Sequence, residues 1–158
     1  MKKTALAFTV LTWLVTMTSS PSASAADNWL GTWKLNVAKS TYSPGPVPKG
    51  ATLTFETTPN GTKLSTELVL ASGTTLKRGY TSKLDGAEVP WVGSADADTA
   101  SAKRIDDNSY QSVSKKDGKV TTTSKVVISA DGKTLTITQT GVNQKGETVN
   151  NVLIYDRQ

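Results

Sequence analysis

The sequence predicts an all-β protein, an antiparallel up-and-down meander barrel of about 8–10 strands. From Ala51 onward, short segments rich in Thr, Val, Leu, Ile and Tyr alternate apolar with polar residues, which is the pattern of half-buried strands. Gly-containing turn dipeptides separate these segments, and no window carries the spacing of an amphipathic helix over three turns. An open sheet of so many strands would expose edges that aggregate, so we expect the first strand to pair with the last.

The first 25 residues have the pattern of a secretory leader. Residues 2–3 are basic, residues 4–17 are apolar, and residues 23–25 form a small-x-small cleavage site. The apolar run is too short to span a bilayer as a permanent helix. We therefore expect a signal peptide at 1–25, a single domain at 26–158, a periplasmic or secreted bacterial protein, and no stable membrane insertion.

The side chains that usually perform metal and acid–base chemistry are missing after the leader. The chain has no Cys and no His, and its two methionines, Met1 and Met17, fall in the leader. Zinc, copper and haem sites draw on thiolate, imidazole or thioether ligands, and general acid–base catalysis near neutral pH most often uses imidazole. We therefore expect no metal ion, no cofactor, and a binding protein rather than an enzyme.

Charge is spread along the chain. There are 18 basic and 13 acidic residues, and the lysines are distributed among turns and strand edges. Spread charge of this kind indicates a solvated face with protected strand edges rather than a nucleic-acid surface. We expect no nucleic-acid partner and a monomer.

Ten strands follow from the alternation and the turn signals. They are Gly31–Asn36, Ala51–Thr58, Lys63–Leu70, Thr74–Leu84, Ala87–Val92, Ala100–Ile105, Ser109–Lys115, Lys119–Ser129, Thr134–Gly141 and Thr148–Arg157. The dipeptides expected to supply the positive φ values of tight hairpin turns are Asn60-Gly61, Asp85-Gly86, Asp117-Gly118 and Asp131-Gly132.

The segment between the first two expected strands has a different character. Pro44, Pro46 and Pro48 stand at alternate positions, and each lacks a backbone donor and restricts the residue before it. We therefore expect a stiff connection outside the sheet, with a single helical turn near Val37–Ser40. The favoured interpretation is a rigid cover with Tyr42 as a plug over one barrel end, and a Pro-rich docking motif is the alternative.

Two short motifs at the ends of the domain carry a family resemblance. Gly31-Thr32-Trp33-Lys34-Leu35, the meander, and the ending Ile154-Tyr155-Asp156-Arg157 resemble the calycins, which include lipocalins and fatty-acid-binding proteins. The likeness is closest to uncharacterised small bacterial lipocalin-like secreted proteins. The resemblance implies that Trp33 closes one end of a lipocalin-like barrel and that Arg157 packs across it as a structural cation–π pair.

The same resemblance includes two departures. Leu153 stands where fatty-acid-binding proteins commonly place an arginine that holds a carboxylate, and the Pro-rich segment stands in place of their helical lid. A carboxylate site at that position and a lid-gated entrance are therefore not expected.

Arg78 is the first candidate for ligand binding. Alternation puts Arg78 and Tyr80 on the apolar side of their strand, and an unpaired buried charge is costly. One interpretation is a grip for an anion or carboxylate inside a pocket. The other is an arginine near the strand end that reaches solvent or pairs with Glu67 or Glu56.

Arg104 and Trp91 complete the candidate set. Ala100, Ala102 and Arg104 share one side of a strand, where small alanines would leave room beside the guanidinium. Trp91 and Trp29 lie near segment ends, where tryptophans either contact apolar ligands at a barrel mouth or pack over a barrel end.

These features predict a secreted or periplasmic barrel that binds a small apolar or amphipathic molecule through Arg78, Tyr80, Trp91 and Arg104. The alternative is a filled barrel that acts as a protein-binding module, as an inhibitor or envelope-associated protein would. An enzyme that uses a carboxylate at the barrel mouth is a third possibility, but no convergent set of residues supports it. An open interior favours the first prediction, and a filled core with an exposed apolar patch favours the second.

Overall fold

The computed structural model describes residues 28–158, so the predicted leader lies outside the described residues. The ten predicted strands are all present, with ends shifted by one or two residues. They are β1 (Gly31–Leu35), β2 (Gly50–Thr58), β3 (Gly61–Val69), β4 (Thr75–Ser82), β5 (Asp85–Pro90), β6 (Thr99–Asp106), β7 (Ser109–Lys116), β8 (Lys119–Ile128), β9 (Thr134–Val142) and β10 (Thr148–Arg157).

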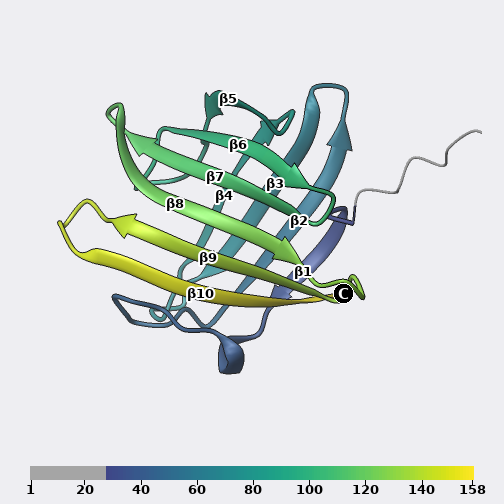
Figure 1. The fold of residues 1–158 in the computed structure, drawn as a ribbon. Helices are drawn as coiled ribbons and strands as arrows, with labels where there is room; N and C mark the ends of the chain where they lie inside the picture. Colours follow the sequence, from purple (N-terminus) through teal and green to yellow (C-terminus); the bar gives the residue numbers. More distant parts are fainter. Residues whose placement is uncertain (1–27) are drawn as a thin grey trace, which may run out of the picture.

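The strands form one antiparallel sheet in the order β4-β3-β2-β1-β10-β9-β8-β7-β6-β5. The first strand therefore pairs with the last, as predicted. The sheet curls so that β6–β10 cross in front of β2–β4 (Figure 1). This arrangement confirms a nearly closed, all-β meander barrel.

The joint between β1 and β10 is built on Trp33 and Arg157. The two residues are directly paired in register, and the guanidinium carbon lies 4.3 Å from the centre of the fully buried indole. Arg157 Nε donates to the Gly132 carbonyl at 2.7 Å, Nη1 donates to the Leu30 carbonyl at 3.0 Å, and Nη2 donates to the Asn28 carbonyl. The predicted cation–π pair is thus confirmed, and Arg157 also ties together three backbone segments.

Aromatic rings fill the barrel behind this joint. Trp29 is 1% exposed, and its carbonyl accepts a hydrogen bond from Trp33 Nε1 at 3.0 Å. The Tyr110 ring lies 5.0 Å from Trp29 and 6.5 Å from Phe55, both in edge-on geometry. Trp29 therefore packs over the end of the barrel where β1 begins, which we call the closed end.

The barrel has a seam between β4 and β5, the two edge strands of the sheet. Gly79 and Val92 join them by an isolated bridge with two 3.0 Å backbone hydrogen bonds. Gly93, with φ +78°, continues the contact, and a Cβ there would lie 2.2 Å from the Lys77 carbonyl oxygen. A residue with a side chain at position 93 could not follow this path without displacing β4.

The predicted turn at Asp85-Gly86 is wrong. Both residues lie inside β5, and the chain reverses at Lys83-Leu84, where Leu84 has φ 58°. The Ser82 hydroxyl accepts the Leu84 amide at 3.0 Å and stabilises this reversal. Since β4 and β5 separate instead of pairing as a hairpin, no two-residue hairpin turn is needed there.

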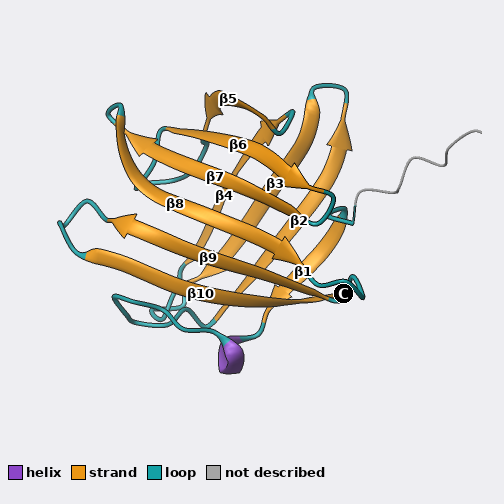
Figure 2. Cartoon of the chain, in the orientation of Figure 1, coloured by secondary structure: helices purple, strands orange, loops and turns teal. Residues whose placement is uncertain are grey.

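A 3₁₀ turn, η1 (Val37–Lys39), follows β1 and lies below the barrel (Figure 2). Within residues 28–158 there is no helix long and apolar enough to cross a membrane. The next residues, 41–49, form the Pro-rich cover. It is tied to β10 through a bridge from Thr41 to Val152 and through a 2.9 Å bond from the Asn150 amide to the Ser43 carbonyl. The expected helical turn is confirmed, and the Pro-rich segment lies outside the ten strands, as predicted.

We expect Arg157→Ala to lower the free energy of unfolding by about 2 kcal/mol. The substitution removes a cation–π contact and the charged hydrogen bonds to backbone carbonyls, which we discount because Arg157 is exposed. Urea unfolding measures the change, with the exposed Lys119→Ala as a control within about 0.5 kcal/mol of wild type. A loss as small as that of the control would show that the joint does not depend on Arg157.

Candidate functional site

The inward positions of β4 carry the first site residues. Tyr80 and Ser82 are buried, and Arg78 is half-buried, so the predicted alternation holds from Arg78 onward, whereas Leu76 is 37% exposed. Its guanidinium lies beside two adjacent cavities at the end of the barrel beneath the Pro-rich cover. The interior of the barrel is therefore not completely filled.

The outer chamber, about 170 Å³, is lined mostly by hydroxyl and amide side chains. These are Ser43, Ser94, Ser114, Thr121, Thr122, Gln139, Asn143 and Asn151. The inner chamber, about 80 Å³, is richer in apolar and aromatic side chains, although the hydroxyl residues Thr66, Ser112 and Ser124 also line it. Its lining includes Leu53, Leu64, Tyr80, Tyr110, Val126, Ile137, Leu153 and Tyr155.

Four residues line both chambers, and we call them the waist: Tyr42, Arg78, Trp91 and Gln139. They come from the Pro-rich cover, β4, the loop after β5, and β9. Tyr42 thus takes the position of the predicted plug. The topology brings these side chains together between a chamber with more hydroxyl and amide groups and a chamber with more apolar side chains.

Arg78 has no acidic partner at the waist. Its Nε is buried without a hydrogen-bond acceptor. The two glutamates that could have paired with Arg78 bind lysines instead: Glu67 lies 2.7 Å from Lys77, and Glu56 lies 3.7 Å from Lys63. The structure therefore leaves a cationic donor facing the chambers, which is the arrangement that the anion-grip interpretation requires.

Trp91 supplies a second buried donor. Its Nε1 also has no acceptor, and its ring centre lies 5.1 Å from that of Tyr80. Three of the four predicted ligand-binding residues, Arg78, Tyr80 and Trp91, thus lie together. The two unpartnered donors make the waist suited to an acceptor-rich group.

Arg104 lies elsewhere. Its amide donates to the Leu84 carbonyl at 2.9 Å, near the closed end, and the residue lines neither chamber. Ala100 and Ala102 are fully buried in the core, and neither of them lines the outer or the inner chamber. The shared face predicted for these three residues is right, but Arg104 lies farther along β6, and its height along the barrel separates it from Arg78.

The tyrosines of the interior remain neutral near neutral pH. Burial raises the pKa of Tyr80 to about 12 and raises the pKa of Tyr110 well above its ordinary value. Burial also raises the pKa of Tyr155, although the charge of Arg78 opposes that shift. Among the residues that the structure describes, the exposed Asp96 is the one acidic residue that lines either chamber. Among the described residues, Arg78 is therefore the one charged side chain of the waist itself.

An amide network fixes the wall opposite the Pro-rich cover. Asn151 Oδ1 accepts the Ser43 amide at 2.8 Å, and Asn151 Nδ2 donates to Gln139 Oε1 at 2.9 Å. Gln139 Nε2 reaches only Thr122 Oγ1, at 3.5 Å, a distance at which a hydrogen bond is weak. Sequence reasoning placed Gln139 on the interior wall but missed Asn151, which alternation along β10 puts on the same side as Tyr155.

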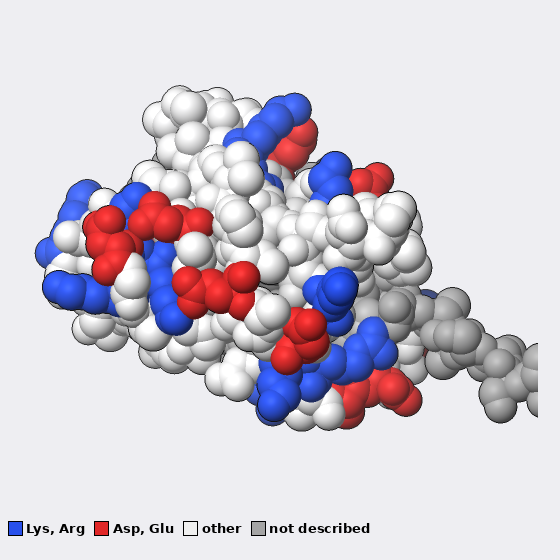
Figure 3. All heavy atoms as spheres, turned by 90° about the horizontal axis from the view of Figure 1, so that it is seen from above, with Lys and Arg blue, Asp and Glu red and all other residues white. Residues whose placement is uncertain are grey.

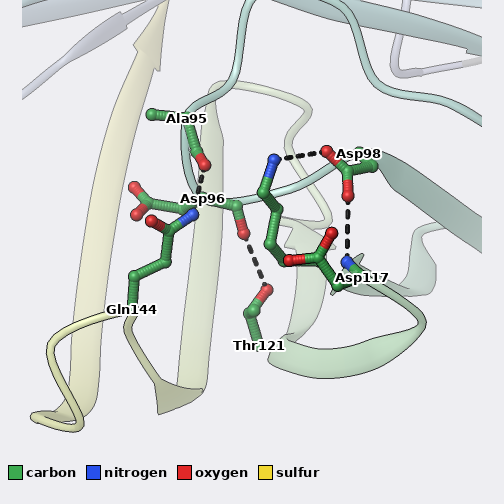
Figure 4. Close-up of polar contacts among 7 residues, drawn as sticks. Ala95, Asp96, Asp98, Asp117, Thr121 and Gln144 are labelled. Carbon is green, nitrogen blue, oxygen red and sulfur yellow. Dashed lines mark hydrogen bonds and ion pairs between the residues drawn. The ribbon is translucent and has the colours of Figure 1, made fainter.

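The Trp91 loop, residues 91–98, forms the second cover and is clipped to the β7–β8 hairpin (Figure 4). The Asp98 carboxylate accepts Lys116 Nζ at 2.5 Å and the Asp117 amide at 2.9 Å. The Thr121 hydroxyl donates to the Asp96 carbonyl at 3.1 Å, and the Gln144 side chain donates to the Ala95 carbonyl. These contacts hold the loop in place, and with it the indole of Trp91 at the waist.

The outer surface has a different electrostatic character from the waist. On the face in Figure 3, basic and acidic side chains lie next to one another in small groups. Ion pairs between partly exposed side chains include Lys115 with Glu88, at 2.5 Å. Within residues 28–158, no three or more acidic side chains are grouped so that they could hold a metal ion.

We expect Arg78→Met to raise the free energy of unfolding by about 1 kcal/mol, because it replaces an uncompensated charge with an apolar side chain of similar length. Thermal and urea unfolding measure the change. The control is Lys77→Met on the outer face, where the side chain is 76% exposed, and it should stay within about 0.5 kcal/mol of wild type. A loss of about 3 kcal/mol in Arg78→Met would instead show that the guanidinium is needed for folding.

The clip on the Trp91 loop should open in acid. The Asp117 amide, and next the Lys116 ammonium, hold the pKa of Asp98 below its ordinary value of 3.8. A lowered carboxyl pKa stabilises the clip at pH values above 3.8, and this stabilisation is lost as the pH falls below 3.8 through the lowered pKa. Acrylamide quenching should therefore increase in that range. In protein expressed without residues 1–25, which contain Trp13, it reports Trp91 because Trp29 and Trp33 are 1% and 0% exposed.

Two variants control this measurement. Trp91→Phe gives the background quenching, and Asp98→Asn should be quenched more than wild type already at neutral pH. Far-UV circular dichroism at each pH separates loop opening from unfolding of the barrel. Equal quenching of wild type and Asp98→Asn at neutral pH would contradict the role of the carboxylate.

Comparison with known proteins adds little on function. No protein-family model matches the chain, and no curated protein matches it by sequence. Two similar solved structures are zebrafish ileal bile acid-binding protein complexed with cholic acid and the siderocalin Ex-FABP, described as functioning through dual ligand specificities. The first is 13% identical, covers 83% of this chain and 99% of its own, and has a TM-score of 0.49. The second is 13% identical, covers 83% of this chain and 74% of its own, and has a TM-score of 0.40.

At TM-scores below 0.5, neither likeness identifies a ligand for this chain. The meander barrel and the joint between Trp33 and Arg157 agree with the calycin resemblance expected from the sequence, and membership of that superfamily stays a prediction. Kinship with small bacterial secreted proteins stays a prediction.

Proposed function

We propose that this protein binds a small amphipathic molecule inside the barrel, with an anionic group of the ligand on Arg78. The observation that carries the proposal is the pair of buried donors, Arg78 Nε and Trp91 Nε1, that face the chambers without acceptors. A buried polar group without a partner costs free energy, and a ligand oxygen removes that cost. The role of Arg104 as a further anchor, expected from the sequence, has no support from its position near Leu84.

The apolar part of the ligand fits the inner chamber. Leu64, Ile137 and Leu153 supply aliphatic surface there, and Tyr80 and Tyr155 supply rings. Pockets for small molecules usually combine such a lining with a few fixed polar groups that set orientation. The positive field of Arg78 would favour an anion over a neutral ligand of equal size.

Access would be through the end of the barrel that carries the Pro-rich cover and the Trp91 loop, since both line the outer chamber. The proposal includes export from the cell, with residues 1–25 removed as a signal peptide, because the leader carries the basic, apolar and small-x-small parts in order. A binding protein of this kind would meet its ligand in the periplasm or in the medium.

Native mass spectrometry of protein recovered from the periplasm of expressing bacteria tests the proposal. We expect a fraction of the protein to carry a small-molecule adduct, which Arg78→Gln loses and the outer-face control Lys77→Gln retains. The intact mass in the same spectra reports whether residues 1–25 have been removed. Protein that is consistently free of adduct, or the same adduct on Arg78→Gln, would count against an anion site at Arg78.

A further inference from the structure

The outer chamber is larger than the inner one, and the two volumes limit the size of the ligand groups that each chamber can hold. An apolar cavity of about 150 Å³ holds one benzene molecule. The outer chamber, about 170 Å³, therefore has room for one six-membered ring, whereas the inner chamber, about 80 Å³, has room only for a short branch. Both fall below the range of about 300–1,000 Å³ that is usual for drug-sized ligands. Neither chamber alone has room for a long apolar tail.

The larger chamber is also the more polar one. Ser114 and Thr121 are buried hydroxyl residues of its wall, and Asn151 is a buried amide. Gln139 Nε2 makes only a 3.5 Å contact with Thr122, so this amide has donor capacity left at the waist. A ring in this chamber would meet hydroxyl and amide groups, and an unsubstituted hydrocarbon ring would leave them without partners.

The waist determines which group joins the two chambers. Arg78, Trp91 and Gln139 all present N–H donors there, and two of these donors are buried without any acceptor. The hydroxyl of Tyr42 is the remaining polar group of the waist. A planar carboxylate offers two acceptor oxygens, and it matches both the charge and the fork of a guanidinium.

We propose that the ligand is a compact hydroxylated ring acid: a single six-membered ring with hydroxyl groups in the outer chamber, and a carboxylate at the waist. This inference rests on the proposed function and adds the ligand class. Such a ligand differs from a fatty acid, in which the apolar chain is the largest part, because here the largest part is a hydroxylated ring. Aromatic hydroxy acids and sugar acids share this chemistry, and the face of Trp91 can stack against either ring.

Isothermal titration calorimetry of the unmodified protein separates these ligands. The panel is 3,4-dihydroxybenzoate, glucuronate, cyclohexanecarboxylate as the matched ring without hydroxyls, and decanoate as the linear acid. We expect one of the two hydroxylated acids to bind at least about tenfold more tightly than both of the others. Tighter binding of 3,4-dihydroxybenzoate would identify the ligand as an aromatic hydroxy acid, and tighter binding of glucuronate would identify it as a sugar acid.

Variants link the preference to the chamber. Gln139→Leu should remove most of the advantage over cyclohexanecarboxylate, Arg78→Gln should weaken binding of every acid by about tenfold or more, and Lys77→Gln should change neither. If Gln139→Leu fails to fold, as circular dichroism would show, the panel on unmodified protein still decides. Decanoate binding as tightly as the ring acids, in a manner dependent on Arg78, would overturn the ring-acid inference alone. Absence of any binding dependent on Arg78 would overturn the proposed function as well.

Discussion

The pairing of the first strand with the last is the constraint on which the rest of the structure depends. Trp33 and Arg157 place β1 and β10 side by side in the middle of the sheet order, so the two edge strands become β4 and β5, which are neighbours in the chain. The seam of the barrel therefore lies at mid-sequence. Edge strands must be covered, and the Trp91 loop does so by bonding Val92 to Gly79. The same loop carries the indole to the waist, so closing the barrel also assembles the candidate site.

The ten strands could be predicted from the sequence because alternation and turn dipeptides are local signals. The closure could be predicted because an open sheet of ten strands would expose its edges. Alternation has a period of two residues, and Gly31, Trp33 and Arg157 stand at the two ends of the domain. The seam could not be predicted. Asp85-Gly86 has the same local preference as Asp117-Gly118, yet only the second lies at a hairpin turn, because tertiary pairing decides which strands stay together.

The site was predicted in part for a related reason. Alternation assigns a residue to a face of the sheet, so it identified both Arg78 and Arg104, but it does not give the height of a residue along the barrel. Arg104 lies beside Leu84 at the closed end, whereas Arg78 lies beneath the covers. Asn151 could not be predicted as a site residue, because its Oδ1 accepts a hydrogen bond from the amide of Ser43, which lies 108 positions away in the chain.

Two arginines in this barrel illustrate how the same side chain serves structure and binding. Arg157 is exposed, yet it donates to three backbone carbonyls and covers an indole, so its hydrogen-bonding capacity is used within the chain. Arg78 lies deeper, and its Nε has no acceptor among the described residues. A fold selected for stability alone would place the satisfied arginine inside and the unsatisfied one at the surface. The opposite arrangement suits the proposed binding site, because a ligand oxygen can satisfy a donor that has no partner among the described residues.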